Sequence, residues 1–236
     1  MSADSTHRGD VILSERLKAA GRAALAPLVN VLAAAGVMPN TVTWSGLILV
    51  AAASYLIWQR SLLLGAIVLA AGAILDALDG GLARAQGGET RFGAFLDSTL
   101  DRIGEGLVYL GIVAYWLSAT SRPFVPVMLA VLALGGSFLV SYSRARAEAQ
   151  GFTASTGLGQ RPERLIILVL GLALAGLGNP VLLQVAMAVI AVLAWVTVAQ
   201  RIWNVRAQAA SAGLPESIGP SESIGQSDPF GQHKES

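Results

Sequence analysis

The stretch DALDGGLARAQGGETRFGAFLDSTLD, residues 76–101, places four aspartates in an otherwise apolar part of the chain. At about 100° per residue, the first half of the pattern covers an arc of roughly 140° on one helix. This half consists of Asp76, Asp79, Gly80, Ala83 and Arg84. Gly93, Asp97 and Asp101 recur every four residues and form one stripe on the next helix. The Gly-Gly-Glu-Thr turn between the helices makes them antiparallel neighbours, so we expect the two aspartate-bearing faces to meet.

Four aspartates inside membrane helices are costly, at about 3 kcal/mol each near a helix centre and on the order of 10 kcal/mol together. Their mutual repulsion adds to this cost, and Arg84 with Arg102 does not balance four negative charges. Two divalent ions would balance them. Carboxylates without histidine or cysteine indicate a hard ion, Mg²⁺ or Mn²⁺. Two such ions suit phosphoryl chemistry, because they neutralise phosphate oxygens and orient the displacement.

The composition of the whole chain indicates a membrane protein. Of 236 residues, 54% are hydrophobic and 13% charged, with a net charge of +1 and no cysteine. A mean hydropathy of +0.61 excludes a disordered chain and a nucleic-acid binder. The lack of cysteine excludes a disulfide framework and a cysteine nucleophile. We therefore predict an all-α integral membrane protein whose charge-free stretches form six transmembrane helices, at 41–59, 61–86, 91–120, 122–150, 162–177 and 180–206.

The ends of the chain differ from this central region. Residues 1–40 are predicted to form an N-terminal tail with an amphipathic helix lying on the membrane, residues 41–207 the six-helix domain, and residues 208–236 a disordered polar tail. Lysine and arginine gather in the N-terminal region, the second and fourth connections and the C-terminal end. This asymmetry predicts a multi-pass protein of the cell membrane with both termini and the aspartate cluster facing the cytosol.

The spacing D-x2-D-G-x2-A-R-x8-G-x3-D-x3-D, met here at every fixed position, resembles the signature of the CDP-alcohol phosphotransferases. The resemblance extends over about residues 14–206. It implies that Asp76, Asp79 and Asp97 bind two metal ions, while Asp101 binds one of them and is the general base. It also implies a CDP-diacylglycerol-type donor, CMP as leaving group, and a homodimer.

The same resemblance implies a nucleotide site. Residues 38–43, MPNTVT, are similar to the family's P-x-x-V-T motif at the start of the first span. The implied contacts of the CDP-lipid are Asn40, Thr41, Val42, Thr43, Asp79, Gly80, Ala83, Arg84 and Thr90. Arg84 offers two parallel donors to a diphosphate. For Asn40 and Thr41 the alternative is helix capping, which both residue types commonly perform.

Three further segments bear on the acceptor alcohol: SYSRARAEAQG at 141–151, RPERL at 161–165 and AQRIW at 199–203. They resemble the bacterial and archaeal branch of the family that takes inositol phosphate. The implied contacts of the acceptor phosphate are Ser141, Arg144, Arg146, Arg164 and Arg201. Arg144 stands where many of these enzymes have lysine, which keeps the charge but changes the geometry.

The bland interpretation of these arginines is that they only set membrane topology, and it applies most to Arg146 and Arg161. We expect Glu163 to pair with an arginine, and Glu105 to form a hydrogen bond within the bundle. Glycerol 3-phosphate or another alcohol is the alternative acceptor. A cation transporter is the alternative from another functional class, and a non-catalytic scaffold is a third.

Overall fold

The computed structural model describes residues 25–88, 90–154 and 156–212. Within them a short helix, Leu25–Ala34, precedes six longer ones. These are α2 (Pro39–Trp58), α3 (Leu62–Ala85), α4 (Arg91–Ala119), α5 (Phe124–Ala149), α6 (Arg161–Gly176) and α7 (Val181–Ser211). Of the predicted N-terminal tail and amphipathic helix (1–40) and the predicted C-terminal tail (208–236), residues 1–24 and 213–236 lie outside the described residues.

The predicted helix ranges agree with the structure to within two residues at each end, with one exception. Helix α7 continues to Ser211, so residues 208–211 are helical and do not belong to a disordered tail. The cause is a contact that the sequence does not reveal. The side-chain carboxamide of Gln208 accepts a hydrogen bond from Thr153 N at 2.9 Å and donates one to Thr153 O at 2.7 Å. This pairing ties the end of α7 to the segment that follows α5.

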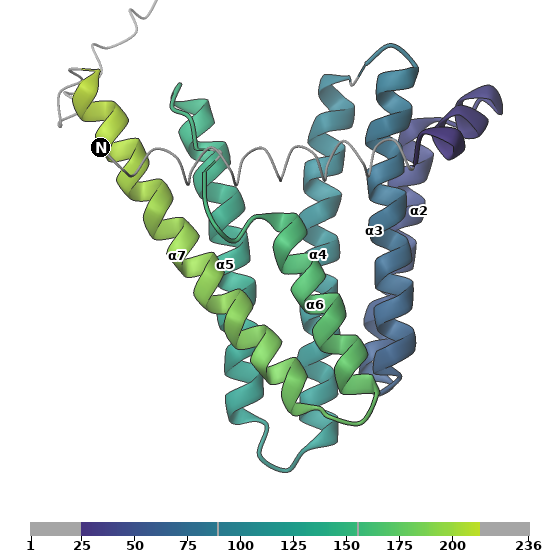
Figure 1. The fold of residues 1–236 in the computed structure, drawn as a ribbon, viewed down its shortest axis with the longest axis vertical. Helices are drawn as coiled ribbons and strands as arrows, with labels where there is room; N and C mark the ends of the chain where they lie inside the picture. Colours follow the sequence, from purple (N-terminus) through teal and green to yellow (C-terminus); the bar gives the residue numbers. More distant parts are fainter. Residues whose placement is uncertain (1–24, 89, 155, 213–236) are drawn as a thin grey trace, which may run out of the picture.

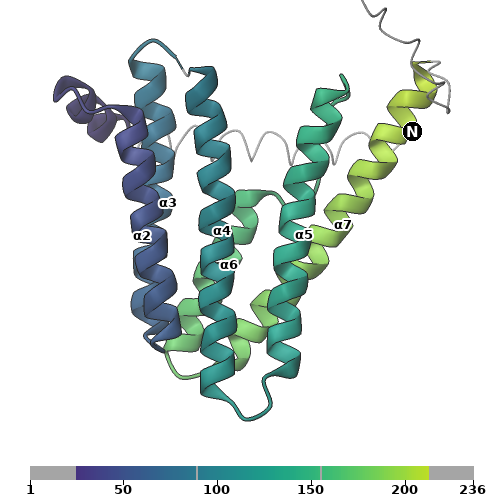
Figure 2. The same ribbon diagram turned by 180° about the vertical axis from the view of Figure 1, so that it is seen from behind.

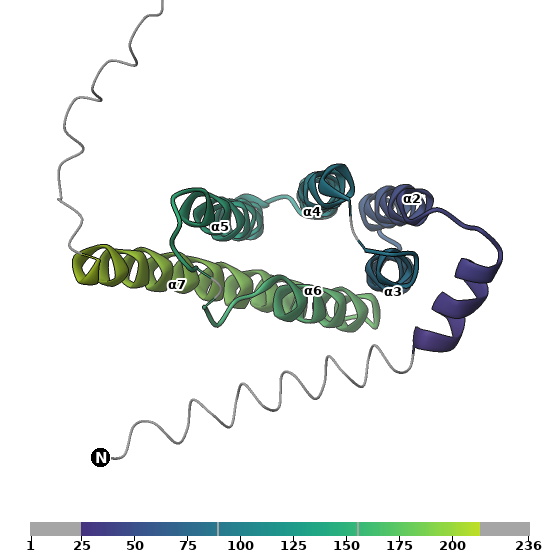
Figure 3. The same ribbon diagram turned by 90° about the horizontal axis from the view of Figure 1, so that it is seen from above.

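The helices form two rows, with α5, α4 and α2 in one and α7, α6 and α3 in the other (Figure 3). The connection between α3 and α4 and the C-terminal end of α7 lie at one end of the bundle, which we call the α3–α4 end (Figures 1 and 2). Helix α6 is the shortest of α2 to α7, with 16 residues, and begins part of the way down the bundle. Its N-terminus is therefore set among the other helices.

Small residues allow the helices that carry the site to approach closely. Gly111 of α4 faces Ser54 of α2, and a Cβ at Gly111 would lie 2.5 Å from the Ser54 carbonyl oxygen. Ser54 Oγ also donates a hydrogen bond of 2.5 Å to Leu107 O. Fully buried Ile57, Ile112 and Leu172, from α2, α4 and α6, belong to the same hydrophobic core. The core thus fixes the relative positions of the helices above which the aspartates lie.

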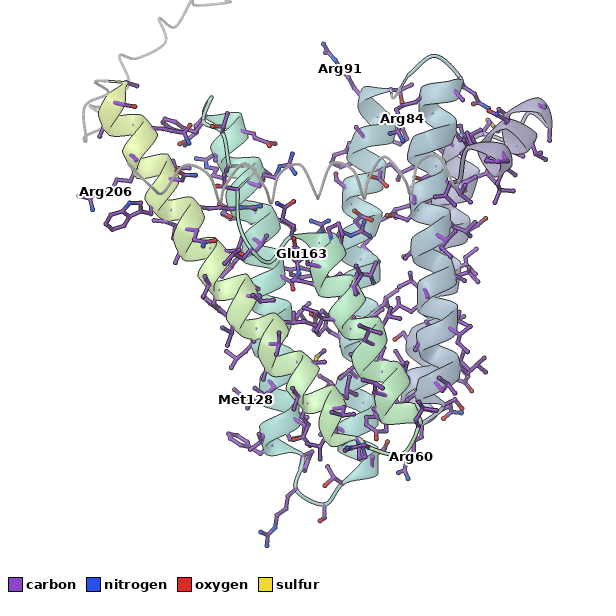
Figure 4. All side chains as sticks on the ribbon, in the orientation of Figure 1. Arg60, Arg84, Arg91, Met128, Glu163 and Arg206 are labelled. Atoms are coloured by element: carbon purple, nitrogen blue, oxygen red, sulfur yellow. The ribbon has the colours of Figure 1, made fainter. Side chains whose placement is uncertain are left out.

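Within the described ranges, four helices, α2, α3, α5 and α7, are long and apolar enough to cross a membrane. Helix α4 is long enough but carries several charges, and α6 is short. Arg84, Arg91 and Arg206 lie toward the α3–α4 end, whereas Arg60 lies at the opposite end (Figure 4). The chain is a multi-pass membrane protein, and three of the four arginines labelled in Figure 4 lie toward the α3–α4 end.

Candidate active site

The aspartates of α3 and α4 converge as their spacing predicts. Asp76, Asp97 and Asp101 each offer a carboxylate oxygen, and these oxygens all lie within 4.8 Å of one another. Helices α3 and α4 were expected to be direct neighbours, but instead both pack against α2. The four-residue spacing keeps Asp97 and Asp101 on one face of α4. Asp79 is outside this group. It is buried and accepts a hydrogen bond of 2.7 Å from Thr43 Oγ1 of α2.

This donor set fits a divalent ion. All three groups are carboxylates, which hard cations prefer. Two oxygens bound to one ion at about 2.1 Å are at most about 4.2 Å apart, so small side-chain movements complete the coordination. Asp79 lies within electrostatic range of Asp76 and Asp97, and is a further carboxylate available to a second ion. The site can therefore hold divalent metal.

Arg161, at the start of α6, is the main residue that the sequence analysis missed. Its Nη1 lies 2.8 Å from Asp76 Oδ2 and its Nη2 lies 2.5 Å from Asp101 Oδ1. Arg102 Nη2 contacts the other oxygen of Asp101 at 3.3 Å. The assignment of Arg161 to topology is wrong for this structure. The available signal was its position three residues before Arg164, which places both on one helical face.

Beneath the aspartates, Glu105 links α4 to α6. It follows Asp101 by one helical turn, and its Oε1 accepts a hydrogen bond of 3.0 Å from Arg164 Nη2. Arg164 is 3% exposed and also donates to Gly159 O at 2.7 Å. The predicted hydrogen bond of Glu105 within the bundle is thus confirmed. Glu163 does not behave as expected, because it accepts a hydrogen bond from the backbone N–H of Gln160 at 2.8 Å and so caps α6.

These polar groups line one end of an open cavity that encloses about 770 Å³, its mouth included. Asp76, Asp101, Arg161 and Arg164 lie in the wall contributed by α3, α4 and α6. The remaining wall is mainly apolar, with residues such as Leu47, Val50, Leu69, Leu165 and Leu168. A ligand with both a charged head and apolar parts matches such a cavity.

The predicted nucleotide residues gather at the starts of α2 and α4 and the end of α3. A Cβ at Gly93 would lie 3.8 Å from Asn40 Oδ1 and 3.0 Å from Thr90 Oγ1, so these three are neighbours. Arg84 extends back over Gly80, whose Cβ would lie 3.5 Å from the Arg84 guanidinium. Thr90 also caps α4 by accepting a hydrogen bond of 2.9 Å from Gly93 N.

The capping alternative for Asn40 and Thr41 is wrong. The N-cap of α2 is Met38, without a side-chain hydrogen bond, because Pro39 begins the helix. Asn40 and Thr41 therefore lie in the first turn, where both side chains are exposed. Val42 is buried against Val29, Leu78 and Leu82, and Ala83 is also buried. These two shape the site through packing.

The predicted acceptor residues come from three helices. Arg201 of α7 is 4% exposed and donates to Thr156 O at 3.1 Å and to Val140 O. Ser141 of α5 accepts a hydrogen bond from Arg102. Arg144 and Arg164 both repel the charge of Arg201, so the three guanidinium groups are near one another.

The two remaining predicted acceptor residues, Arg144 and Arg146, are more exposed to solvent. Arg144 pairs with Glu148 at 2.7 Å, and its side chain is 55% exposed. Arg146, on the same helix, is exposed. The predicted acceptor arginines therefore range from the exposed Arg144 and Arg146 to the buried Arg164 and Arg201, and of these four Arg164 lines the cavity.

A family model described as CDP-alcohol phosphatidyltransferase matches residues 36–203. An archaetidylinositol phosphate synthase of Pyrococcus horikoshii is 40% identical over 176 residues, which are 74% of this chain and 87% of the relative. A phosphatidylinositol phosphate synthase of Mycobacteroides abscessus is 42% identical over 190 residues, which are 80% of this chain and 86% of the relative.

Solved structures of the phosphatidylinositol phosphate synthase of Mycobacterium tuberculosis have the same fold. The one with CDP-DAG bound is 37% identical, with a TM-score of 0.70, over 76% of this chain and 92% of that one. The one in complex with manganese and citrate is 36% identical, with a TM-score of 0.71, over 76% and 88%.

Proposed function

Because the chain belongs to the CDP-alcohol phosphatidyltransferase family, it is a membrane transferase of lipid synthesis, and we propose that its acceptor is inositol phosphate. In this proposal it transfers a phosphatidyl group from CDP-diacylglycerol, or a related CDP-lipid, to an acceptor hydroxyl and releases CMP. The observation that carries the proposal is the convergence of Asp76, Asp97 and Asp101 beside a cavity lined by two of them, Asp76 and Asp101, together with Arg161 and Arg164.

The reaction replaces one phosphate ester bond with another. The acceptor oxygen attacks the β-phosphorus of the CDP-lipid, and the bond from that phosphorus to the bridging oxygen of CMP breaks. Asp101 accepts the proton of the hydroxyl, which leaves the atoms and charges balanced. Two divalent ions, Mg²⁺ or Mn²⁺, would neutralise the phosphate oxygens and make the hydroxyl more acidic. Asp76, Asp79, Asp97 and Asp101 would hold them.

The donor lies on the side of α2 and α3 in this proposal. Asn40, Thr41 and Thr90 are exposed at the α3–α4 end, where a cytidine can reach them. Arg84 and the backbone at Gly80 hold the diphosphate, since a planar guanidinium binds two phosphate oxygens at once. Thr43 positions Asp79 through its 2.7 Å hydrogen bond.

The acceptor lies on the side of α5, α6 and α7. A neutral alcohol would not require several nearby guanidinium groups, whereas a phosphate would compensate their repulsion. Ser141, Arg144, Arg146, Arg164 and Arg201 are the proposed phosphate contacts. Glycerol 3-phosphate carries the same group and is the second candidate acceptor.

The membrane arrangement is also part of the proposal. We infer six crossings by α2 to α7, with residues 41–207 as the catalytic domain and both termini in the cytosol. The arginines near the α3–α4 end support this orientation. We place the protein in the cell membrane as a homodimer.

The test is an acceptor panel scored by CMP release. Purified wild-type protein with CDP-diacylglycerol and Mg²⁺ should release CMP when inositol phosphate is added. The Asp101→Asn variant should not release CMP under the same conditions. Release with glycerol 3-phosphate alone would keep the reaction and refute the acceptor. A cation transporter would release no CMP with any acceptor.

A further inference from the structure

We propose that Arg161 has two alternating partners: it neutralises Asp76 and Asp101 until they bind divalent metal, and it then binds the phosphate of the acceptor. This exchange rests on the proposed function, because it requires a metal site and an anionic acceptor. It gives a role in metal affinity and acceptor affinity to a residue outside the aspartate motif.

The first step follows from the atoms that Arg161 occupies. Its two terminal nitrogens contact Asp76 Oδ2 at 2.8 Å and Asp101 Oδ1 at 2.5 Å, and so bridge α3 and α4. Arg102 contacts the remaining oxygen of Asp101 at 3.3 Å. Both oxygens of Asp101 are thus engaged by guanidinium groups. Each oxygen keeps a second lone pair, so metal can approach Asp101, but the two positive charges already beside it compete with the ion for the same carboxylate.

Electrostatics selects Arg161 as the pair that opens. A guanidinium in contact with the metal-bound carboxylates would repel a divalent charge only a few ångströms away. Arg102 is held additionally by its hydrogen bond to Ser141. The Arg161 side chain is 37% exposed, and within the described part of the chain its ion pairs are those with Asp76 and Asp101. It can leave them by rotating about its own long stem.

The second step follows from the neighbourhood of Arg161. Arg164 lies three residues later on the same face of α6, and both residues line the same cavity. Arg164 is fixed by Glu105 and Gly159 O, so it is a stationary anchor. A phosphate held by Arg164 lies within reach of a released Arg161, which can bind it through two parallel hydrogen bonds. Metal binding would in this way prepare the acceptor site.

The experiment compares wild type, Arg161→Gln, Arg161→Lys and the control Arg206→Gln, whose side chain is exposed on α7. Mn²⁺ affinity is measured by calorimetry on detergent-solubilised protein without substrate, and KM for inositol phosphate by CMP release. We expect Arg161→Gln to bind Mn²⁺ roughly tenfold more tightly and to raise KM roughly tenfold, about 1.4 kcal/mol in each direction. Arg161→Lys should be intermediate in both, and Arg206→Gln should match wild type.

Arg161→Gln is expected to strengthen Mn²⁺ binding and to weaken the use of inositol phosphate, and these opposite effects make the proposal falsifiable. General damage to the site would weaken both affinities, and that outcome would overturn the exchange. So would unchanged Mn²⁺ affinity in Arg161→Gln, or tighter Mn²⁺ binding with unchanged KM. If wild type releases CMP and the variants give one of these three contradicting results, the exchange of partners by Arg161 is refuted while the proposed function stands. If wild type releases no CMP with any acceptor, the proposed function fails, and the second step of the exchange fails with it.

Discussion

Arg164 of α6 and Glu105 of α4 form a buried ion pair of 3.0 Å directly beneath the aspartate cluster. Arg164 is 3% exposed and the Glu105 side chain 13%. Removing one partner of such a pair leaves an uncompensated charge in a low-dielectric interior. We therefore expect Glu105→Ala to lower the apparent stability by about 3–5 kcal/mol, measured by thermal or chemical unfolding in detergent.

A surface pair provides the matched control for this prediction. Arg144 and Glu148 are joined at 2.7 Å on α5, but their side chains are 55% and 50% exposed. Glu148→Ala should cost less than about 1 kcal/mol. The double variant Glu105→Leu with Arg164→Met should recover most of the loss, because it removes both charges. Equal losses for Glu105→Ala and Glu148→Ala would contradict the buried character of the first pair.

The helix boundaries could be predicted because charges and glycine-proline turns mark where apolar sequence stops. The meeting of the aspartate-bearing faces could also be predicted, because the helical period and the short turn between the two helices determine it. The role of Arg161 could not be predicted, because its partners are 85 and 60 residues earlier in the chain, at Asp76 and Asp101. Only the packing of α6 against α3 brings them together. The true end of α7 was missed for the same reason, because Gln208 binds a distant backbone segment.

Asp97→Asn tests whether the aspartate cluster binds metal. The variant replaces one of three converging carboxylates, so metal bound at this site loses a charged ligand. We expect the rise in unfolding temperature produced by Mn²⁺ in wild type to shrink by at least about half. An unchanged response to Mn²⁺ would refute Asp97 as a ligand.

Gly111→Ala tests the close contact between α4 and α2. The added Cβ would lie 2.5 Å from the carbonyl oxygen of Ser54, a backbone atom that cannot rotate away. Overpacking of this kind costs about 1–3 kcal/mol. Gly135→Ala is the control, since a Cβ there meets nothing within 4 Å. Because alanine favours a helix over glycine by up to about 1 kcal/mol, the control should be neutral or stabilising in the same unfolding assay.

Two shortened chains test whether the last turns of α7 hold the segment between α5 and α6. Besides Gln208, which bonds to Thr153, Asn204 Nδ2 donates to Thr156 Oγ1 at 2.8 Å and Arg201 Nε donates to Thr156 O at 3.1 Å. A chain ending at residue 212 keeps all of these contacts, whereas one ending at 206, the predicted helix end, loses those of Gln208.

We expect the amide hydrogen of Thr153 to exchange at least about tenfold faster in the shorter chain, because its hydrogen-bond acceptor, the Gln208 side chain, is gone. Hydrogen exchange read by mass spectrometry gives this rate, with the core of α4 as an internal reference that should not change. Gln208→Leu in the full chain should reproduce the faster exchange, because it removes the same hydrogen bonds while leaving the helix in place. Protection that persists in both the shorter chain and this variant would show that Arg201 and Asn204 suffice to hold the segment.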